Sequence, residues 1–267
     1  MKILIVGGGN MGLTYAYGFL KSHIVEASNL VILEKSIDKA EQLESLSIGK
    51  IYGEAGEYIK DMDLIVLAVK PQDIQLLFES IKSFIDDQQL ILSIMAGVEI
   101  NKIAQGLGVS KIIRAMPNLP AQIGLGMTVY TSSTDVTRLE LVTVQNLLSS
   151  SGKTIYVENE SMINAATAIS GSGPAYVFYF MQAMIEKAME MGFSHAESEL
   201  LTFQTFRGAV DLFNKHEITC QEWIQKVSSK GGTTEAAFDG FKTFDVQNGF
   251  KKGVQKALDR AKELSLG

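Results

Sequence analysis

The chain has 267 residues, enough for one large domain or two small ones. Hydrophobic residues make up 46% and charged residues 20%, a balance that is typical of folded proteins and excludes a disordered chain. A net charge of −6 argues against a nucleic-acid surface, which is normally basic. No apolar run approaches the ~20 residues of a membrane-spanning helix and no signal peptide is visible. We therefore expect no membrane partner. The single cysteine permits no internal disulfide, which suits a reducing compartment, so we expect a cytoplasmic protein.

The first stretch with a chemical meaning is a glycine-rich turn near the N-terminus. The apolar run at 3–6 predicts a buried parallel strand, and the residues from Leu13 onward predict a helix. Between them lies a G-x-G-x-x-G loop whose residues are Gly7, Gly9, Asn10, Met11 and Gly12. The glycines of such a loop permit the sharp bend, the approach of a pyrophosphate and close helix–strand packing. The loop predicts dinucleotide binding, the alternative being a glycine-rich turn without a ligand.

Strands and helices alternate along the first 159 residues. Six further apolar stretches are typical of strands, at 30–33, 64–69, 90–94, 111–116, 127–131 and 154–157. Helices are expected at 37–46 and 136–149. This alternation predicts an α/β fold in which residues 1–159 form a doubly wound, mostly parallel sheet of the Rossmann type.

The end of the second strand carries two conflicting signals about the cofactor. Glu34 lies 22 residues beyond Gly12, where an acidic side chain accepts hydrogen bonds from ribose hydroxyls and favours NAD. Lys35 and Ser36 follow at once, and a cation with a hydroxyl suits the 2′-phosphate of NADP. An equal alternative is that Lys35 and Ser36 form a solvated turn. The sequence therefore leaves NADPH and NADH both open as the cofactor.

Other strand ends supply further candidates, because ligands of such sheets bind outside the carboxyl ends of the strands. Lys70 is placed to face a phosphate or a substrate carboxylate, although a lysine in this position is often merely solvated. Asn118, between two prolines, offers both a donor and an acceptor, or else forms a turn. The cofactor-binding candidates at these strand ends are Ala68, Val69, Lys70, Pro71, Ala96, Gly97 and Asn118.

The pattern changes after residue 159, where helical periodicity replaces strands. Helices are predicted at 162–169, 175–191, 196–213, 221–227 and 246–264. Ser194 with Glu197, and Thr219 with Glu222, fit the capping box that begins a helix. The segment 175–191 is apolar on nearly every side, which is typical of a buried helix. Residues 160–267 therefore predict a smaller all-helical domain that buries its apolar surface against a second copy of the chain.

Five motifs together indicate a family. They are Gly-Gly-Gly-Asn-Met-Gly (7–12), Ala-Val-Lys-Pro (68–71), Arg-Ala-Met-Pro-Asn-x-Pro (114–120), Ser-Gly-Ser-Gly-Pro-Ala-Tyr (170–176) and Ser-Ser-Lys-Gly-Gly-Thr-Thr (228–234). With these motifs the chain resembles the pyrroline-5-carboxylate reductases over nearly its whole length. Glu34 departs from many NADP-preferring members, which carry a neutral residue followed by arginine there.

The resemblance implies an activity and an assembly. It implies the NAD(P)H-dependent reduction of 1-pyrroline-5-carboxylate to L-proline, the last step of proline biosynthesis, by hydride transfer to a cyclic imine. It also implies a homodimer through the C-terminal helices, which in some members joins into a ring of dimers. The three histidines are too widely separated in the sequence for a zinc site, so no metal is expected.

The substrate of such a reaction needs an anion site for its carboxylate and a donor at its imine nitrogen. Backbone N–H groups around Gly231 and Gly232, at the start of a predicted helix, can bind the anion, with Ser229 and Thr233 beside them. By resemblance, the catalytic residue is Thr234, whose hydroxyl orients the imine nitrogen. Without the resemblance, Thr233 and Thr234 would be interpreted as a plain helix N-cap pair.

Two other functions are compatible with the glycine loop. A β-hydroxyacid dehydrogenase also joins a Rossmann domain to a helical one, but it places a catalytic lysine after a glycine-rich segment, and residues 171–183 contain none. A non-catalytic NAD(P)-binding sensor keeps the loop but has no need of residues 231–234. Consumption of NAD(P)H with pyrroline-5-carboxylate or with a hydroxyacid separates the three hypotheses.

Overall fold

The computed structural model describes residues 1–266, which divide into two compact units. Unit 1 comprises Met1–Ser172 together with the chain from Ala257 onward, and unit 2 comprises Gly173–Lys256. From residue 158 through residue 266 the chain forms helices and no strand, as the sequence predicted. Within residues 1–266, none of the helices has both the length and the apolar character that crossing a bilayer requires.

Unit 1 is built on an eight-stranded sheet with the strand order β3-β2-β1-β4-β5-β6-β7-β8. The strands are β1 (Ile3–Val6), β2 (Leu30–Leu33), β3 (Lys50–Tyr52), β4 (Leu64–Leu67), β5 (Leu90–Ser93), β6 (Ile112–Met116), β7 (Gly126–Ser132) and β8 (Gly152–Tyr156). All neighbouring strands pair in parallel except β6 and β7, which are antiparallel. The predicted doubly wound, mostly parallel sheet is confirmed, whereas β3 was not predicted.

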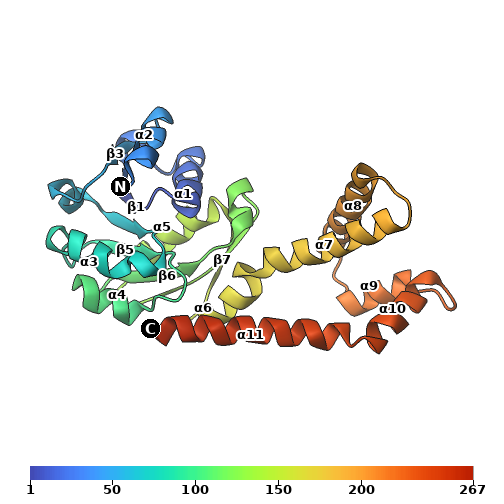
Figure 1. Cartoon of the computed structure of the whole chain (residues 1–267). Helices are drawn as coiled ribbons and strands as arrows, with labels where there is room; N and C mark the ends of the chain where they lie inside the picture. The colour runs from blue at the N-terminus through green and yellow to red at the C-terminus, as the bar shows by residue number, and fades with distance from the viewer. Residues whose placement is uncertain (267) are drawn as a thin grey trace. The chain divides into compact units, whose positions relative to one another are not determined.

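Helices cover both faces of this sheet (Figure 1). They are α1 (Asn10–Lys21), α2 (Ile37–Ser45), α3 (Ile74–Ile81), α4 (Ile100–Leu107) and α5 (Arg138–Ser149). Side chains of a strand alternate between the faces. Ile3 and Ile5 accordingly share a core with buried residues of α1, α2 and α5, while Leu4 and Val6 share one with α3 and α4. Because both faces are covered, the carboxyl edge of the sheet is where unit 1 can bind a ligand.

The second half of the chain contains six helices within residues 1–266. They are α6 (Ser161–Ala166), α7 (Gly173–Glu190), α8 (His195–Asn214), α9 (Cys220–Val227), α10 (Thr233–Thr243) and α11 (Val246–Leu266), with a π-helical turn at Thr167–Gly171. Both predicted capping boxes form, at the starts of α8 and α9. Their geometry is local, so the sequence alone specifies it.

The apolar helix α7 differs from the prediction in one respect. All 18 of its residues are described, and its own chain buries none of them. Large apolar side chains of α7 and α8 are exposed instead, among them Phe178, Tyr179, Leu200 and Val210. The burial that the sequence predicts for α7 is therefore not provided within one chain.

A buried arginine joins four segments of unit 1. Arg114 on β6 is 1% exposed, and it donates from Nη1 to Glu160 Oε1 at 2.8 Å and from Nη2 to Asn164 Oδ1 at 3.1 Å. The same Glu160 oxygen accepts the backbone N–H of Ile100 at 2.8 Å. The Ser265 hydroxyl donates to Asn164 Oδ1 at 3.0 Å. These bonds attach α6 and the end of α11 to the sheet, so unit 1 extends past the boundary at 159/160 that the sequence suggested.

Candidate functional site

The glycines of the loop after β1 have different physical reasons to be glycine. Gly7 has a φ of 104°, and a Cβ there would lie 2.8 Å from the carbonyl oxygen of Ala68. A Cβ on Gly12 would collide with the carbonyl oxygen of Gly7. Gly9, the N-cap of α1, has an ordinary φ of −76°, and no heavy atom of residues 1–266 lies within 4 Å of its Cβ position. The fold requires glycine at positions 7 and 12, whereas the space beside Gly9 is open to a ligand.

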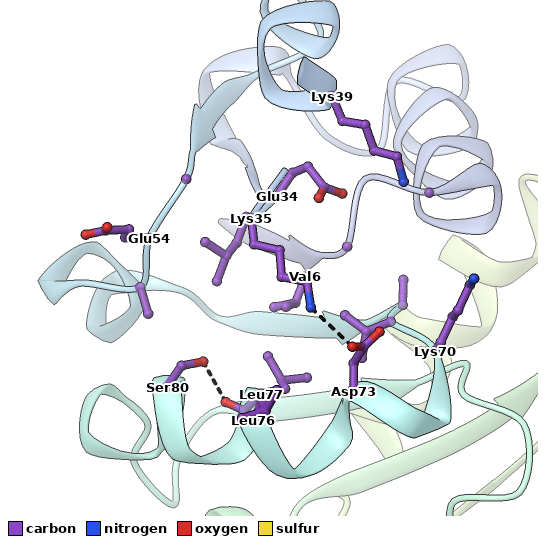
Figure 2. A pocket seen from close by; sticks show the side chains of 17 residues that line it. Val6, Glu34, Lys35, Lys39, Glu54, Lys70, Asp73, Leu76, Leu77 and Ser80 are labelled. Carbon is purple, nitrogen blue, oxygen red and sulfur yellow. Dashed lines mark hydrogen bonds and ion pairs between the residues drawn. The ribbon is translucent and has the colours of Figure 1, made fainter. Parts of the chain in front are cut away.

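A cavity of 530 Å³ opens beside this loop, at the carboxyl ends of β1, β2 and β4 (Figure 2). Its volume is in the range of small-molecule and cofactor sites. Of the residues predicted from the sequence to bind the cofactor, those that line it are Gly7, Gly9, Glu34, Lys35, Ala68, Val69 and Lys70. The glycine loop, the end of β2 and the end of β4 therefore meet in one cavity that suits a dinucleotide.

The carboxylate of Glu34 is held in place on one wall of the cavity. Its Oε2 accepts the backbone N–H of Gly8 and its Oε1 accepts that of Ser36, both at 2.9 Å. The residue is 8% exposed. The neighbouring Lys35 extends across the cavity, and its Nζ forms an ion pair with Asp73 Oδ1 at 3.1 Å (Figure 2). The two residues that gave conflicting signals about the cofactor are thus held by different groups. Backbone amides bind Glu34, and a carboxylate binds Lys35.

Several lining residues were not predicted from the sequence. They are Val6, Leu33, Lys39, Gly53, Glu54, Ala55, Asp73, Leu76, Leu77 and Ser80. Gly53 to Ala55 follow β3, the strand that the sequence analysis missed, and the last four lie at or within α3. One signal could have indicated β3. A doubly wound sheet normally has a further strand beside β2, and the carboxyl end of that strand lies at the same edge of the sheet as the ends of β1 and β2.

A pair of tyrosines supports the segment after β3. The rings of Tyr52 and Tyr58 stack with centroids 3.9 Å apart, and the Tyr58 hydroxyl donates to the carbonyl oxygen of Glu54 at 2.9 Å. Burial raises the pKa of Tyr58 to about 12, and the nearby Tyr52 adds to the shift. The hydroxyl therefore stays protonated well above neutral pH, and it donates the hydrogen bond that holds Glu54 beside the cavity.

The remaining cofactor candidates do not line this cavity. They are Asn10, Met11, Gly12, Ser36, Pro71, Ala96, Gly97 and Asn118. Asn118 donates from Nδ2 to the Ser170 carbonyl at 3.0 Å and accepts the N–H of Met127 at 2.8 Å. Gly97 has a φ of 72°, and a Cβ there would lie 2.9 Å from Cβ of Leu264. These contacts give Asn118 and Gly97 structural roles within unit 1, and their binding of the cofactor stays a prediction.

The predicted substrate loop lies in unit 2, directly before α10. The N–H of Gly231 donates to Glu235 Oε2 at 2.6 Å, and the N–H of Gly232 donates to the carbonyl of Ser229 at 2.9 Å. Two of the amides expected to bind an anion therefore already have partners. The amides of Thr233 and Thr234, which begin α10, lack intrahelical acceptors by helix geometry, and such amides can donate to an anion.

A second cavity, of 680 Å³, lies within unit 2 next to this loop. Ser228 and Glu235 line it together with apolar side chains such as Phe238 and Phe250, whereas the predicted substrate residues do not. The roles of Ser229, Thr233 and Thr234 stay predictions. Among residues 1–266, no cluster of three or more His, Cys, Asp or Glu side chains could hold a metal ion.

Comparison with known proteins identifies the family. Residues 160–264 match the family described as pyrroline-5-carboxylate reductase dimerisation, and residues 2–97 match the family described as NADP oxidoreductase, coenzyme F420-dependent. The pyrroline-5-carboxylate reductase of Aquifex aeolicus is 33% identical over 98% of this chain and 96% of that protein. The chain belongs to the pyrroline-5-carboxylate reductase family. The enzyme of the same name from Pseudomonas aeruginosa is 31% identical over 99% of this chain and 95% of its own length.

Solved structures of pyrroline-5-carboxylate reductases have the same fold. The one from Coxiella burnetii matches with a TM-score of 0.89 and 31% identity, covering 99% of this chain and 98% of that one. The Plasmodium falciparum structure, with NADP bound, matches with a TM-score of 0.89 and 27% identity, with the same coverage of both chains. The resemblance found in the motifs is therefore confirmed over the whole chain, and the hydroxyacid dehydrogenase alternative is not supported.

The contrast between Gly9 and Gly12 predicts two separable defects. The substitution Gly9→Ala should lower the free energy of unfolding by no more than about 1 kcal/mol, the cost of alanine at an N-cap, because its methyl group meets no protein atom. It should raise the Kd for NADH about 10-fold or more, a loss of ~1.4 kcal/mol, because the methyl group fills the approach to the pyrophosphate. Urea unfolding and fluorescence titration with NADH measure the two effects.

Gly12→Ala is the matched control. Its methyl group collides with the backbone of Gly7, so it should destabilise the protein by roughly 1–3 kcal/mol, as overpacking does. A Gly9→Ala protein that binds NADH as tightly as the parent would contradict a pyrophosphate at Gly9.

Proposed function

We propose that this chain reduces 1-pyrroline-5-carboxylate to L-proline with a hydride from NADH or NADPH. The observation that carries the proposal is a family match over 98% of the chain, which includes both the dinucleotide cavity and the loop before α10. The cavity fits the adenosine and pyrophosphate of a dinucleotide, because the space beside Gly9 is open and α1 begins there. A non-catalytic NAD(P)-binding sensor would not need the loop before α10.

The chemistry requires few groups from the protein. When bound, the reduced nicotinamide would supply a hydride from C4 to the carbon of the C=N bond, and the nitrogen would take up a proton from solvent to complete the secondary amine. The hydroxyl of Thr234 donates a hydrogen bond to the imine nitrogen and so fixes the ring for attack. A hydroxyl is too weak an acid to be the first choice as proton donor, so orientation is the role assigned to Thr234.

The carboxylate of the substrate binds at the start of α10. The amides of Thr233 and Thr234 and the positive end of the helix dipole favour an anion there, and the hydroxyls of Ser229 and Thr233 add contacts. Gly231, with a φ of 73°, permits the left-handed turn that brings the chain into α10, and Gly232 is its N-cap. These assignments rest on the motif and on the helix geometry of unit 2.

The end of β2 favours NADH over NADPH. Glu34 is fixed with its carboxylate at the cavity wall, where ribose hydroxyls can donate to it and a 2′-phosphate is repelled. The N–H of Ser36, a donor that a phosphate could use, is already bonded to Glu34. The proposal for this chain is therefore use of both cofactors with NADH at least as effective as NADPH.

The activity is tested by following NAD(P)H absorbance with pyrroline-5-carboxylate. The purified protein should consume NADH and form proline in equal amounts, with kcat/KM for NADH at least equal to that for NADPH. A 2-hydroxyacid with NAD+ is the control and should give no turnover. No turnover of pyrroline-5-carboxylate with either cofactor would contradict the proposed function, and a strong preference for NADPH would contradict the role of Glu34.

The role of Thr234 is tested by removing and restoring its hydroxyl. Thr234→Ala should lower kcat/KM for pyrroline-5-carboxylate about 10-fold or more, which corresponds to one hydrogen bond worth ~1.4 kcal/mol. Thr234→Ser keeps the hydroxyl and should stay close to the parent protein. Parent-like kinetics in the alanine variant would remove Thr234 from the mechanism.

We also propose that the chain acts as a cytoplasmic homodimer. Its residues 160–264 match a dimerisation family, and the exposed apolar faces of α7 and α8 would be covered by a second copy. Light scattering should give the mass of two chains, or a multiple of it if dimers join into a ring. A monomer at micromolar concentration would contradict the proposal.

A further inference from the structure

An ion pair spans the cavity beside the place expected for the adenosine ribose. Lys35 follows the end of β2, and Asp73 lies at the end of a 3-10 turn that runs into α3. Their charged atoms, Lys35 Nζ and Asp73 Oδ1, are 3.1 Å apart, and both residues line the cavity (Figure 2). Lys35 is the cation nearest in sequence to Glu34, so it is the first candidate to bind a 2′-phosphate.

The backbone at Asp73 leaves its side chain available for this contact. Asp73 ends the 3-10 turn Pro71–Asp73 directly before α3, and its φ of −92° and ψ of 1° are not the extended conformation in which an N-cap side chain accepts helix N–H groups. The side chain makes no capping hydrogen bond and accepts from Lys35 Nζ. Asp73 therefore interacts across the cavity and not with its own helix.

The other groups at the end of β2 are also engaged. Glu34 accepts two backbone amides, one of them from Ser36. The charged side chains that line the cavity are balanced: Lys35, Lys39 and Lys70 are positive, and Glu34, Glu54 and Asp73 are negative. An NADP-binding site would instead present an excess of positive charge to the 2′-phosphate.

We propose that Asp73 is a positioning residue for cofactor selection, which holds Lys35 and neutralises it so that the cavity disfavours a 2′-phosphate. The proposal rests on the proposed function only in taking the cavity as the dinucleotide site. Glu34 repels the phosphate directly, and Asp73 neutralises Lys35, the cation next to Glu34 in the sequence. Release of Lys35 from Asp73 therefore improves binding of NADP without new contacts to NAD.

The test measures binding of NAD+ and NADP+ by calorimetry, without the imine substrate. Asp73→Asn should tighten NADP+ relative to NAD+ about 5-fold, the scale of one exposed ion pair. The Asp73 side chain makes no capping hydrogen bond, so the substitution leaves α3 in place. Asp73→Glu keeps the charge and should restore the parent ratio. In a Lys35→Gln background, Asp73→Asn should change the ratio less than about 2-fold, because the released cation is gone.

Two further variants separate this role from general electrostatics. Glu54→Gln removes another carboxylate from the same cavity and should shift the ratio less than Asp73→Asn. Lys39→Gln tests the other cation near β2. The proposal is overturned if Asp73→Asn leaves the ratio unchanged, whatever the effect of Lys39→Gln, or if Asp73→Asn acts equally with and without Lys35.

The outcome also distinguishes this proposal from the proposed function. Binding of both dinucleotides with the expected ratio change, but without turnover of pyrroline-5-carboxylate, would support Asp73 and overturn the assigned reaction. Turnover of pyrroline-5-carboxylate with an unchanged ratio of NADP+ to NAD+ binding would support the assigned reaction and overturn the role of Asp73.

Discussion

The buried guanidinium of Arg114 is the constraint on which the arrangement of unit 1 depends. An arginine cannot lose its charge in a protein, and leaving a buried charge without its partner costs about 3–5 kcal/mol. The chain therefore has to bring a carboxylate and an amide oxygen to β6, and it takes them from Glu160 and Asn164. The same two side chains bind the start of α4 and the end of α11. One charge thus positions segments that are far apart in the sequence.

Glu34, at the cavity, likewise connects separate segments of the chain. Its two oxygens bind the amides of Gly8 and Ser36, so it connects the glycine loop to the turn after β2. A hydrogen bond to a charged group contributes about 1.5–3 kcal/mol, which makes this carboxylate part of the loop's own structure. The group expected to meet the ribose is therefore also one that shapes the loop that meets the pyrophosphate. The proposed cofactor selection would therefore be coupled to the geometry of the loop through one side chain.

The sequence predicted what depends on local pattern. The glycine loop, the apolar strands and the capping boxes at Ser194 and Thr219 are all specified by neighbouring residues, and the structure contains each of them. The missed strand β3 has three residues, none fully buried, and only its pairing with β2 defines it. The pairing of Lys35 with Asp73 joins residues 38 positions apart, and no periodicity in the sequence predicts such a contact. The exposure of α7 has a different cause, because in the proposed homodimer its burial would come from a second chain.

The relative strengths of the two contacts at the end of β2 determine how the cavity can discriminate. Lys35 is 74% exposed, and an ion pair at such a site contributes about 0–1 kcal/mol. A doubly charged phosphate can compete with Asp73 for this cation, so the ion pair alone excludes nothing. Glu34 is buried and bonded to two amides, and it cannot turn away from an incoming phosphate without breaking both. The larger part of any preference for NADH must therefore come from Glu34, with Asp73 setting how much Lys35 can offset it.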